Sequence, residues 1–303
     1  MSLVLQNHLL QKIELNSPAS KDVSLSILRL DRLHELGGGN KRFKLKYNLK
    51  EARAQGKTTL LSFGGAWSNH IHALAAAGLA EGFKTLGIIR GEAAHGLTPT
   101  LQDAQAWGME LHFVSRSDYR LRGDKAYLQV LKDSFDNCYI IPEGGANDLG
   151  AKGCADIVQL IDNFNIDYNL LACACGTGST LAGIVSGISV DKEVLGISVL
   201  KGLQNVEAIV AEAVKSNGSS NKANWKIRHE YHHGGYARVS TELKSFILDF
   251  EQRYRIALDP VYTGKLLFGL FDMIEKGELN DRRIIAIHSG GLQGRRGYDW
   301  LTD

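Results

Sequence analysis

Five glycine-rich turns carry the residues of this sequence whose types and spacing could do chemistry. The first reads Gly37-Gly38-Gly39-Asn40-Lys41 and lies between a β-like run and the helix-like stretch 42–54. A lysine at such a turn can be partly desolvated, which lowers the pKa of its amine and lets it attack a carbonyl group. Because most lysines are solvated surface charges, this turn alone leaves open whether Lys41 is a surface residue or a nucleophile.

The second turn ends in Ser68 and Asn69, where a β-like run passes through glycines into a helix-like stretch. Asn69 could cap that helix and have no other duty. Alternatively, both side chains point into the crevice at the carboxyl end of the strand, where open α/β sheets bind their ligands. The residues alone do not decide between these two interpretations.

The third turn, Gly176-Thr177-Gly178-Ser179-Thr180, gives the strongest local signal and follows the apolar run 170–174. Its backbone N–H groups, its hydroxyls and the helix N-terminus that follows are suited to binding a phosphate. The spacing matches neither G-x-x-x-x-G-K-[ST] nor G-x-G-x-x-G, so we expect a phosphate that is not part of a nucleotide. The alternative is that these glycines only let the strand and the helix pack closely.

The fourth and fifth turns, residues 259–265 and 288–294, place hydroxyl residues beside regular structure but by themselves indicate no more than turns. The histidines His229, His232 and His233 lack the helical H-E-x-x-H frame of a zinc site. We therefore expect no metal there and interpret this segment as a polar loop that lines a cleft.

From about residue 24 onward, short β-branched or leucine-rich runs alternate with longer helix-like stretches. This alternation predicts an α/β fold in which crossover helices join parallel strands. The expected strands are 24–30, 58–63, 85–89, 111–115, 139–141, 170–174, 194–199 and 284–288. The expected helices are 42–54, 69–81, 98–107 with Thr98 as N-cap, 121–135, 149–163 and 180–187. The polar segment 215–224 predicts a mobile surface loop.

Composition favours a globular protein whose partner is a small molecule. A chain of 303 residues with 44% hydrophobic composition can bury a large core. The 35 basic residues nearly balance the 33 acidic ones, so no basic field suggests nucleic acid or a membrane surface as partner. No run is long enough to span a membrane and the N-terminus lacks signal-peptide features, which predicts a cytoplasmic location. The 4 cysteines are too few for a disulfide framework and are expected to be reduced thiols.

Together these turns resemble the pyridoxal-phosphate family that contains 1-aminocyclopropane-1-carboxylate deaminase and D-cysteine desulfhydrase. The resemblance covers most of the chain and rests on G-N-K-x-x-K-L at residues 39–45, on Ser68-Asn69 and on the turn 176–180, in the family's order. It implies pyridoxal 5'-phosphate as cofactor and the two-domain fold of the tryptophan synthase β chain, each domain an open, mostly parallel sheet flanked by helices. We expect a large cofactor domain of residues 1–47 and 158–303, a small inserted α/β domain of residues 48–157, and a homodimer.

The resemblance also implies roles for individual residues. Lys41 would carry the cofactor as a Schiff base, and Asn69 would hydrogen-bond the ring oxygen of the cofactor. The phosphate would be held by Gly176, Thr177, Gly178, Ser179 and Thr180, and Thr263 and Ser289 would also contact the cofactor. The substrate site would consist of Ser68 at the substrate carboxylate, the two tyrosines Tyr236 and Tyr262, and the neighbouring Trp67, Asn69 and His70.

Two positions favour one reaction of the family over the other. The deaminases resemble one another in having Glu after the tyrosine of V-Y-x-G-K and Leu before the late Gly-Gly pair, whereas the desulfhydrases carry small hydroxyl residues at both. Here these residues are Thr263 and Ser289. A neutral hydroxyl at the pyridine nitrogen makes a weaker electron sink than a carboxylate does, which suits a good leaving group such as a thiol. We therefore expect a lyase that converts D-cysteine or another small D-amino acid into pyruvate, ammonia and hydrogen sulfide.

Several alternatives stay open. Trp67 stands where better-known members have Gln, which removes an amide donor and leaves room for a different or narrower substrate. The chain could instead open the ring of 1-aminocyclopropane-1-carboxylate to give 2-oxobutanoate and ammonia, or it could bind pyridoxal phosphate without catalysis. A dinucleotide-binding oxidoreductase is disfavoured by the glycine spacing. The preference for D-amino acids rests on the resemblance alone.

Overall fold

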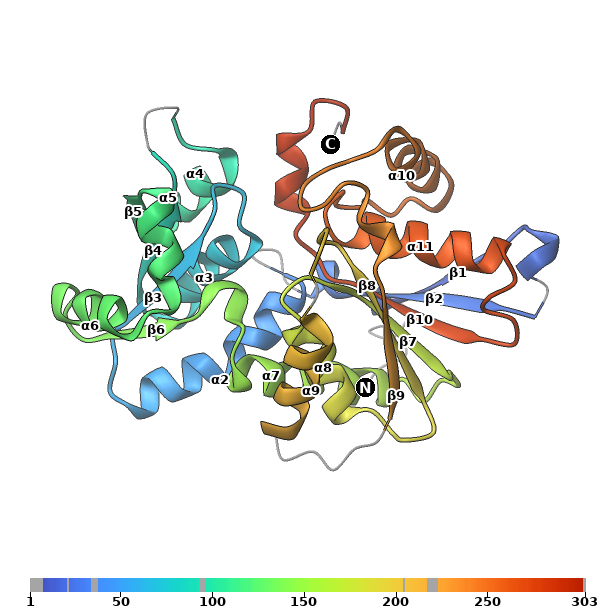
Figure 1. Ribbon diagram of the computed structural model, residues 1–303, viewed down its shortest axis with the longest axis horizontal. Helices are drawn as coiled ribbons and strands as arrows, with labels where there is room; N and C mark the ends of the chain where they lie inside the picture. The colour runs from blue at the N-terminus through green and yellow to red at the C-terminus, as the bar shows by residue number, and fades with distance from the viewer. Residues whose placement is uncertain are drawn as a thin grey trace.

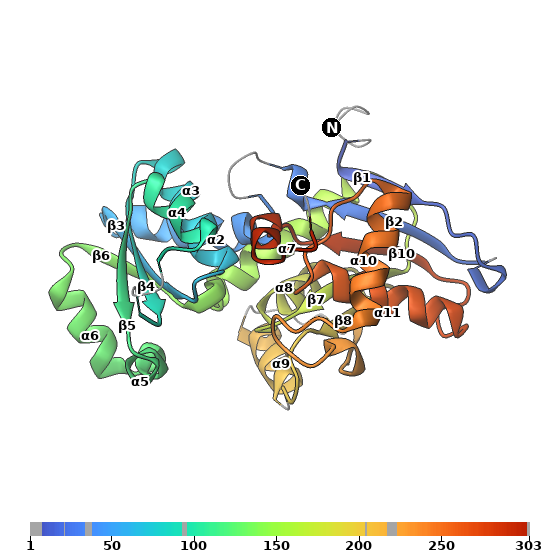
Figure 2. The same cartoon turned by 90° about the horizontal axis from the view of Figure 1, so that it is seen from above.

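Two parallel-strand sheets joined by helices make up the molecule (Figure 1). The computed structural model describes residues 8–20, 22–33, 38–92, 96–203, 205–216 and 223–301. A six-stranded sheet lies on the right of Figure 1 and a four-stranded sheet on the left, and the view from above in Figure 2 separates them in the same way. We call them the large sheet and the small sheet.

The large sheet has the strand order β1-β2-β10-β7-β8-β9, with β1 antiparallel to β2 and the other neighbouring pairs parallel. Its strands are β1 (Leu10–Ile13), β2 (Ser24–Arg29), β7 (Leu170–Cys175), β8 (Glu193–Ser198), β9 (Asn224–Arg228) and β10 (Arg283–His288). Successive side chains of a strand point to opposite faces, so each face has its own core. Leu25 and Ile27 pack with helices α10 (Thr241–Tyr254) and α11 (Thr263–Glu275), whereas Leu28 packs with α7 (Asp148–Asp162), α8 (Ser179–Gly187) and α9 (Val206–Ser216).

The small sheet has the order β5-β4-β3-β6 and is parallel throughout. Its strands are β3 (Thr59–Gly64), β4 (Lys84–Arg90), β5 (Met109–Val114) and β6 (Cys138–Ile141). One face is covered by α2 (Asn40–Ala54), α3 (Asn69–Glu81) and α4 (Pro99–Ala106), and the other by α5 (Arg116–Arg120) and α6 (Lys125–Ser134). Short 3₁₀ helices that matter below are η4 (Leu121–Gly123), η5 (Glu143–Gly145), η6 (Glu230–His232) and η7 (Leu292–Gly297).

The α/β class expected from the sequence is confirmed, and each of the eight expected strands coincides with a strand of the structure to within a few residues. Thr98 is the N-cap of α4, as expected. The expected helix 121–135 was placed wrongly at its start, because Asp124 accepts a hydrogen bond from the Tyr127 N–H and α6 begins only at Lys125. For the region 200–283 the sequence predicted no strand or helix, whereas the structure has α9, β9, α10 and α11. Most of the expected surface loop, residues 217–222, lies outside the described residues.

The expected division of the chain at residues 48 and 157 stays a prediction. Both positions fall inside helices, in α2 and in α7, and these two helices pack directly on each other. The four cysteines are free and buried, which agrees with the expected thiols. Over the ranges that the structure describes, no helix is long and apolar enough to cross a membrane.

The contact between α2 and α7 depends on Gly153, where a Cβ atom would lie 1.9 Å from the carbonyl oxygen of Phe43. In an unconstrained helix, Gly→Ala stabilises by roughly 1 kcal/mol. At this site we expect the opposite sign: Gly153→Ala should destabilise the protein by about 1–3 kcal/mol, because the two helices must move apart.

Urea denaturation measures this effect. The control is Gly123→Ala, since no heavy atom lies within 4 Å of the Cβ position there. A Gly153→Ala protein at least as stable as the wild type would show that α2 and α7 do not require this close approach.

Candidate active site

A cleft of about 660 Å³ is lined by turns from both sheets. Its walls include most of the site residues predicted from the sequence: Lys41, Trp67, Ser68, Asn69, His70, Gly176, Thr177, Gly178, Thr180, Tyr236, Tyr262 and Ser289. The two others lie behind the wall, Ser179 with its Oγ 3.2 Å from Thr177 Oγ1 and Thr263 with its Oγ1 3.5 Å from Ser289 Oγ. The five turns identified in the sequence therefore meet in one place.

The turn before Lys41 packs directly against the turn after β10. Gly39 has a positive φ of 94°, and a Cβ atom there would lie 2.2 Å from the Ser289 carbonyl oxygen, so only glycine fits without a shift. The backbone N–H of Asn40 donates to the same carbonyl at 3.1 Å, and its side-chain amide donates to Thr180 Oγ1 at 3.0 Å. These contacts fix the start of α2 against both other turns. Gly37 lies outside the described residues.

The amine of Lys41 lies in the cleft and donates to the Gly144 carbonyl oxygen at 3.2 Å. Burial lowers the pKa of Lys41 well below its ordinary value, and the nearby Lys44 lowers it further. A lowered pKa makes the neutral, nucleophilic amine available near neutral pH. The expectation of a desolvated lysine at this turn therefore has a physical basis in the structure.

Lys44 is a second buried lysine, one turn further along α2, and the sequence analysis assigned it no role. It is 2% exposed, its Nζ donates to Ser179 Oγ at 2.7 Å, and burial lowers its pKa. Within the described residues it forms no ion pair with a carboxylate. A buried cation without a counter-ion is costly and attracts an anion. The i,i+3 spacing of the two lysines on one helix face was the signal that could have revealed it.

A phosphate would satisfy these groups. The hydroxyls of Thr177 and Ser179 lie 3.2 Å apart beside Lys44, and the N-terminus of α8 begins at Ser179 with Gly178 in a left-handed conformation as its N-cap. The turn supplies N–H groups, hydroxyls, a helix dipole and a buried ammonium, which together match the charge and the acceptor oxygens of a phosphate. The residues present therefore fit a phosphate-bearing cofactor.

Ser68, and not Asn69, caps the helix that enters from β3. Ser68 Oγ accepts the Ile71 N–H at 3.3 Å, which makes the N-terminus of α3 part of the cleft. The interpretation of Asn69 as the cap is wrong, because its side chain lies instead against the turn after β10. There Asn69 accepts a hydrogen bond from Gln293, and a Cβ atom on Gly291 would lie 2.1 Å from its amide nitrogen.

His70 is buried and leaves one ring nitrogen without a partner. Ser62 donates its hydroxyl to the Ile141 carbonyl at 2.7 Å, so His70 Nε2, 2.9 Å from Ser62 Oγ, carries the proton that it donates to Ser62. His70 Nδ1 is then an acceptor, and it has no hydrogen-bond partner in the described part of the chain. Burial, together with Lys41 and Lys44, lowers the pKa of His70 well below its ordinary value, so the ring is neutral.

Three aromatic side chains form walls of the cleft. Trp67 is 36% exposed and lies against Gly297, whose Cβ position is 3.1 Å from its ring. Tyr236 and Tyr262 meet edge to face with centroids 6.4 Å apart, and the Tyr262 ring covers Gly176. Burial raises the pKa of both tyrosines, which keeps the phenols protonated and able to donate.

Lys265 supports the segment that carries Tyr236. Its side chain is fully buried, and Nζ donates to the Gly235 carbonyl at 2.7 Å and to the Val199 carbonyl at 3.4 Å. Burial lowers the pKa of Lys265 to about 8. This lysine belongs to the motif V-Y-x-G-K, but nothing in the sequence indicates where its amine lies.

At the base of the cleft the hydroxyls of Thr263 and Ser289 lie 3.5 Å apart. Asp259, the acidic residue of the same turn, accepts the backbone N–H groups of Val261, Tyr262 and Thr263 at 3.1, 2.6 and 2.9 Å. Its carboxylate therefore caps α11. Of this hydroxyl pair, Ser289 lines the cleft and Thr263 lies directly behind it.

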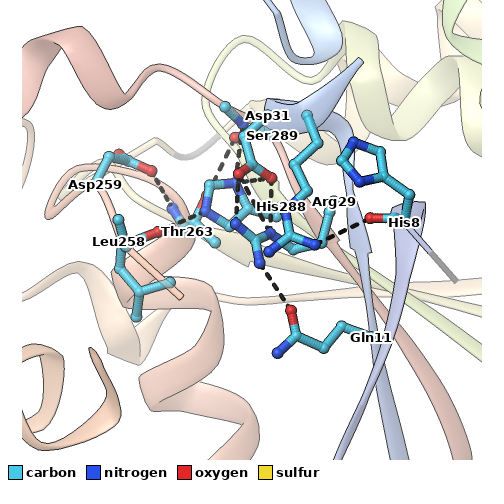
Figure 3. A network of polar contacts seen from close by, with 12 residues as sticks. His8, Gln11, Arg29, Asp31, Leu258, Asp259, Thr263, His288 and Ser289 are labelled. Atoms are coloured by element: carbon cyan, nitrogen blue, oxygen red, sulfur yellow. Dashed lines mark hydrogen bonds and ion pairs between the residues drawn. The ribbon is translucent and has the colours of Figure 1, made fainter. Parts of the chain in front are cut away.

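A buried polar network holds Ser289 from behind (Figure 3). The preceding residue, His288, lies with Nε2 2.8 Å from the Ala257 carbonyl and with Nδ1 3.5 Å from Asp31 Oδ1. Arg29 and Asp31 form an ion pair at 2.7 Å beside it. Burial raises the pKa of Asp31, but His288 and Arg29 lower it by more, so the carboxyl is ionised.

The histidine segment near residue 230 does not line the cleft, so that interpretation is wrong. His229 pairs with Glu207 and His233 contacts Ser240, so these side chains are held in separate contacts. The described residues contain no group of His, Cys, Asp and Glu that could hold a metal ion.

Comparisons with known proteins agree on one family. A family model described as pyridoxal-phosphate dependent enzyme matches residues 13–290. The chain is 32% identical over 282 residues to a putative 1-aminocyclopropane-1-carboxylate deaminase of Thermotoga maritima, covering 88% of each chain. It is 30% identical to the bifunctional D-cysteine desulfhydrase/1-aminocyclopropane-1-carboxylate deaminase of Arabidopsis thaliana, covering 84% of this chain and 69% of that protein. The crystal structure of an ACC deaminase homologue superposes with a TM-score of 0.83 at 28% identity, covering 95% of this chain and 90% of that one.

Replacement of Lys44 by methionine tests the buried cation. Lys44→Met keeps the volume but removes the charge, so we expect inorganic phosphate to bind about tenfold more weakly or worse. In the cofactor-free protein the same change should raise the free energy of unfolding by about 1 kcal/mol at neutral pH, because an unpaired buried charge is lost.

The pH dependence of stability provides a second test of Lys44. Because the pKa of Lys44 is lowered in the folded state, the wild type gains stability as pH rises toward 10.5, and its deficit relative to Lys44→Met should shrink. Calorimetry and urea denaturation measure both effects, with the exposed Lys50→Met on the same helix as control. Unchanged phosphate affinity would contradict the assignment of Lys44 to a phosphate site.

Proposed function

Because the chain belongs to the family of pyridoxal-phosphate dependent enzymes, we propose that it eliminates a thiol from a small D-amino acid, with D-cysteine as the first substrate to test. The relatives named as deaminase and desulfhydrase support the coarser activity, a cofactor-dependent elimination or deamination. The finer assignment rests on the residues at the base of the cleft.

The cleft offers one group for each part of the cofactor. We assign Lys41 as the residue that binds the cofactor aldehyde through its amine, and Lys44, the hydroxyls of residues 177–180 and the N-terminus of α8 as the phosphate site. Asn69 is assigned to the oxygen on the cofactor ring. Glycines at 176 and 178 have no side chain, so the backbone N–H groups of this turn could approach the phosphate closely. The Tyr262 ring covers Gly176.

Bound pyridoxal phosphate would supply an electron sink for the pair of electrons left when the Cα–H bond breaks. The chain supplies the proton transfer. Lys41 Nζ, with its lowered pKa, is the base that accepts the Cα proton, and the Gly144 carbonyl orients that amine. Ser68 and the N-terminus of α3 bind the substrate carboxylate, because free N–H groups and a helix dipole favour an anion there.

The two tyrosines shield and position the substrate. Tyr262 lies over the phosphate turn and Tyr236 meets it edge to face, so the substrate side chain would lie against these two rings. Their raised pKa values keep both phenols as hydrogen-bond donors. The Tyr262 ring would shield one side of the reacting bond from water and strengthen the polar contacts there.

The observation that carries thiol elimination is the hydroxyl pair of Thr263 and Ser289 at the base of the cleft. Asp259, the carboxylate of the same turn, is engaged by three backbone N–H groups, which supports our assignment of a neutral hydroxyl rather than this acid to the pyridine nitrogen. A less positive ring stabilises less carbanion charge, which favours substrates with a good leaving group. The net reaction converts D-cysteine and water into pyruvate, ammonia and hydrogen sulfide.

Ring opening of 1-aminocyclopropane-1-carboxylate is the second candidate, because the Thermotoga maritima relative bears the name of that deaminase. Binding of the cofactor without turnover is the third. The homodimer and the cytoplasmic location expected from the sequence stay predictions.

The first experiment measures sulfide and pyruvate release from D-cysteine and from L-cysteine by the cofactor-loaded protein. We expect release from D-cysteine, abolished in Lys41→Ala and retained in the exposed control Lys50→Ala. Borohydride reduction followed by peptide mass mapping should locate the cofactor on Lys41. A reduced adduct of unchanged yield in Lys41→Ala would refute the lysine assignment, and cofactor binding without release from any substrate would support the non-catalytic alternative.

Thr263→Glu tests the hydroxyl pair. A carboxylate at this position should favour the protonated pyridine ring, so we expect sulfide release to fall at least tenfold and 2-oxobutanoate to appear from 1-aminocyclopropane-1-carboxylate. Thr263→Gln is the matched control, because glutamine has the size of glutamate but no charge. This variant should not produce 2-oxobutanoate from 1-aminocyclopropane-1-carboxylate. Sulfide release that stays at the wild-type rate in Thr263→Glu would show that residue 263 does not meet the pyridine nitrogen.

A further inference from the structure

Four arginines gather at the carboxyl edge of the small sheet. Arg90 is the last residue of β4. Because Ile89 pairs with Gly64, Arg90 lies beside Gly65, and its guanidinium is 3.6 Å from the position that a Cβ atom would take on Gly65. The next strand ends level with it, since Arg90 pairs with Val114. The other three are Arg116 and Arg120 of α5 and Arg122 of η4, and we call the four the arginine cluster.

A buried tyrosine supports the cluster. Tyr119 is 3% exposed, and the guanidinium groups of Arg90 and Arg122 lie 5.6 and 5.0 Å from its ring centroid. Glu143 binds the Tyr119 hydroxyl with one oxygen at 2.7 Å and Arg122 with the other at 2.6 Å. Glu143 directly precedes Gly144, whose carbonyl accepts the Lys41 amine, so the cluster is connected to the reacting end of the cleft.

The positive charge of this cluster is largely uncompensated. Glu143 pairs with Arg122, whereas Arg90, Arg116 and Arg120 form no ion pair with any carboxylate in the described ranges. Like charges gathered without a counter-ion repel one another, and this cost is relieved when an anion binds.

The cluster opens into the cleft. Arg90, Arg116 and Arg122 line both the cleft and an adjoining cavity of about 350 Å³. Burial raises the pKa of Tyr236, and a hydrogen bond with Tyr262 and the charge of Arg90 counteract part of this effect. The charge of Arg90 therefore reaches the proposed substrate wall. Lys44 and the turn 176–180 already provide for the phosphate of the cofactor, and Ser68 provides for the substrate carboxylate. Neither group accounts for these arginines.

We propose that the arginine cluster is a second anion subsite, which binds a negatively charged group at the far end of the substrate side chain. The inference rests on the proposed function and extends it: the substrate class is an α-amino acid whose β substituent ends in an anion. Arginine suits this task because its planar fork binds a carboxylate or a phosphate with two parallel hydrogen bonds.

The reaction balances for such a substrate. In S-carboxymethyl-cysteine, the Cα–H bond breaks with transfer of the proton to Lys41, and the Cβ–S bond breaks with the electron pair leaving on sulfur. A Cα=Cβ bond forms, and water hydrolyses the unsaturated amine. The products are pyruvate, ammonia and mercaptoacetate, so no further reactant is needed.

Binding is measured with D-2-aminoadipate, in which a methylene replaces the sulfur, so that it binds without losing a leaving group. Its 6-amide has the same shape and no distal charge. By calorimetry on the cofactor-loaded protein we expect the acid to bind about tenfold more tightly than the amide, as an added ion pair in a partly screened cleft would give. In the double variant Arg90→Gln/Arg116→Gln this ratio should fall to about one.

Arg253→Gln is the matched control, because Arg253 is also exposed, stacks on a tyrosine at 5.2 Å and lies outside the cleft. It should keep the tenfold ratio. Inorganic sulfate should weaken binding of the acid but not of the amide. A ratio near one in the wild type, a tenfold ratio retained by the double variant, or an equal effect of sulfate on both ligands would overturn the subsite.

Turnover separates this proposal from the proposed function. S-carboxymethyl-D-cysteine should exceed the neutral S-carbamoylmethyl-D-cysteine in kcat/KM by a similar factor. If D-cysteine releases sulfide but the distal charge has no effect on binding, the subsite is wrong and the elimination stands. If the acid binds preferentially and no sulfur compound yields pyruvate, the elimination is wrong and the subsite stands.

Discussion

The close approach of the Gly39-Asn40 backbone to Ser289 is the constraint on which the rest of the site depends. Asn40 N–H donates to the Ser289 carbonyl, and Gly39 leaves no space for a Cβ atom beside it. This contact joins the first turn of α2 to the carboxyl end of β10, so a helix that packs on the small sheet begins on the large one (Figure 1). Lys41 is thereby placed beside the phosphate turn and above the Thr263–Ser289 pair. A displacement of a few tenths of an ångström at Gly39 would therefore move the amine relative to all its partners.

Burying the two lysines lowers the stability of the cofactor-free protein, and binding of the cofactor would offset this cost. Lys41 and Lys44 lie on one face of α2, and burial lowers both pKa values. Lys44 lowers the pKa of Lys41 further, and both lysines lower the pKa of His70. A phosphate dianion would neutralise the charge of Lys44. The free energy that folding expends on burying these groups is thus recovered on binding, which couples stability to cofactor affinity.

The sequence predicted the turns well because their function is local: a glycine must precede Lys41, and the phosphate turn must open a helix. It failed where a role depends on burial. Lys44 and Lys265 are indistinguishable from surface lysines until their amines are placed against Ser179 and Gly235. The helix α11 was missed because its cap, Asp259, lies four residues before the helix and acts through three successive backbone N–H groups. The short strands β1 and β9 lie at the edges of the large sheet and lack a continuous buried pattern.

The arginine cluster was also beyond a sequence argument, because its members are up to 32 residues apart and meet only through the register of β4 and β5. Trp67 follows the neighbouring strand β3, which pairs with β4 up to Gly64 and Ile89. Trp67 replaces an amide donor near the α-carboxylate with an aromatic wall, while Arg90 adds a cation further out on the same sheet edge. Under the proposed function, both residues would contact the substrate side chain and neither is assigned to the cofactor. Under the proposed function, Trp67 and Arg90 of the small sheet could therefore differ between related enzymes without disturbing the phosphate turn, which follows β7 of the large sheet.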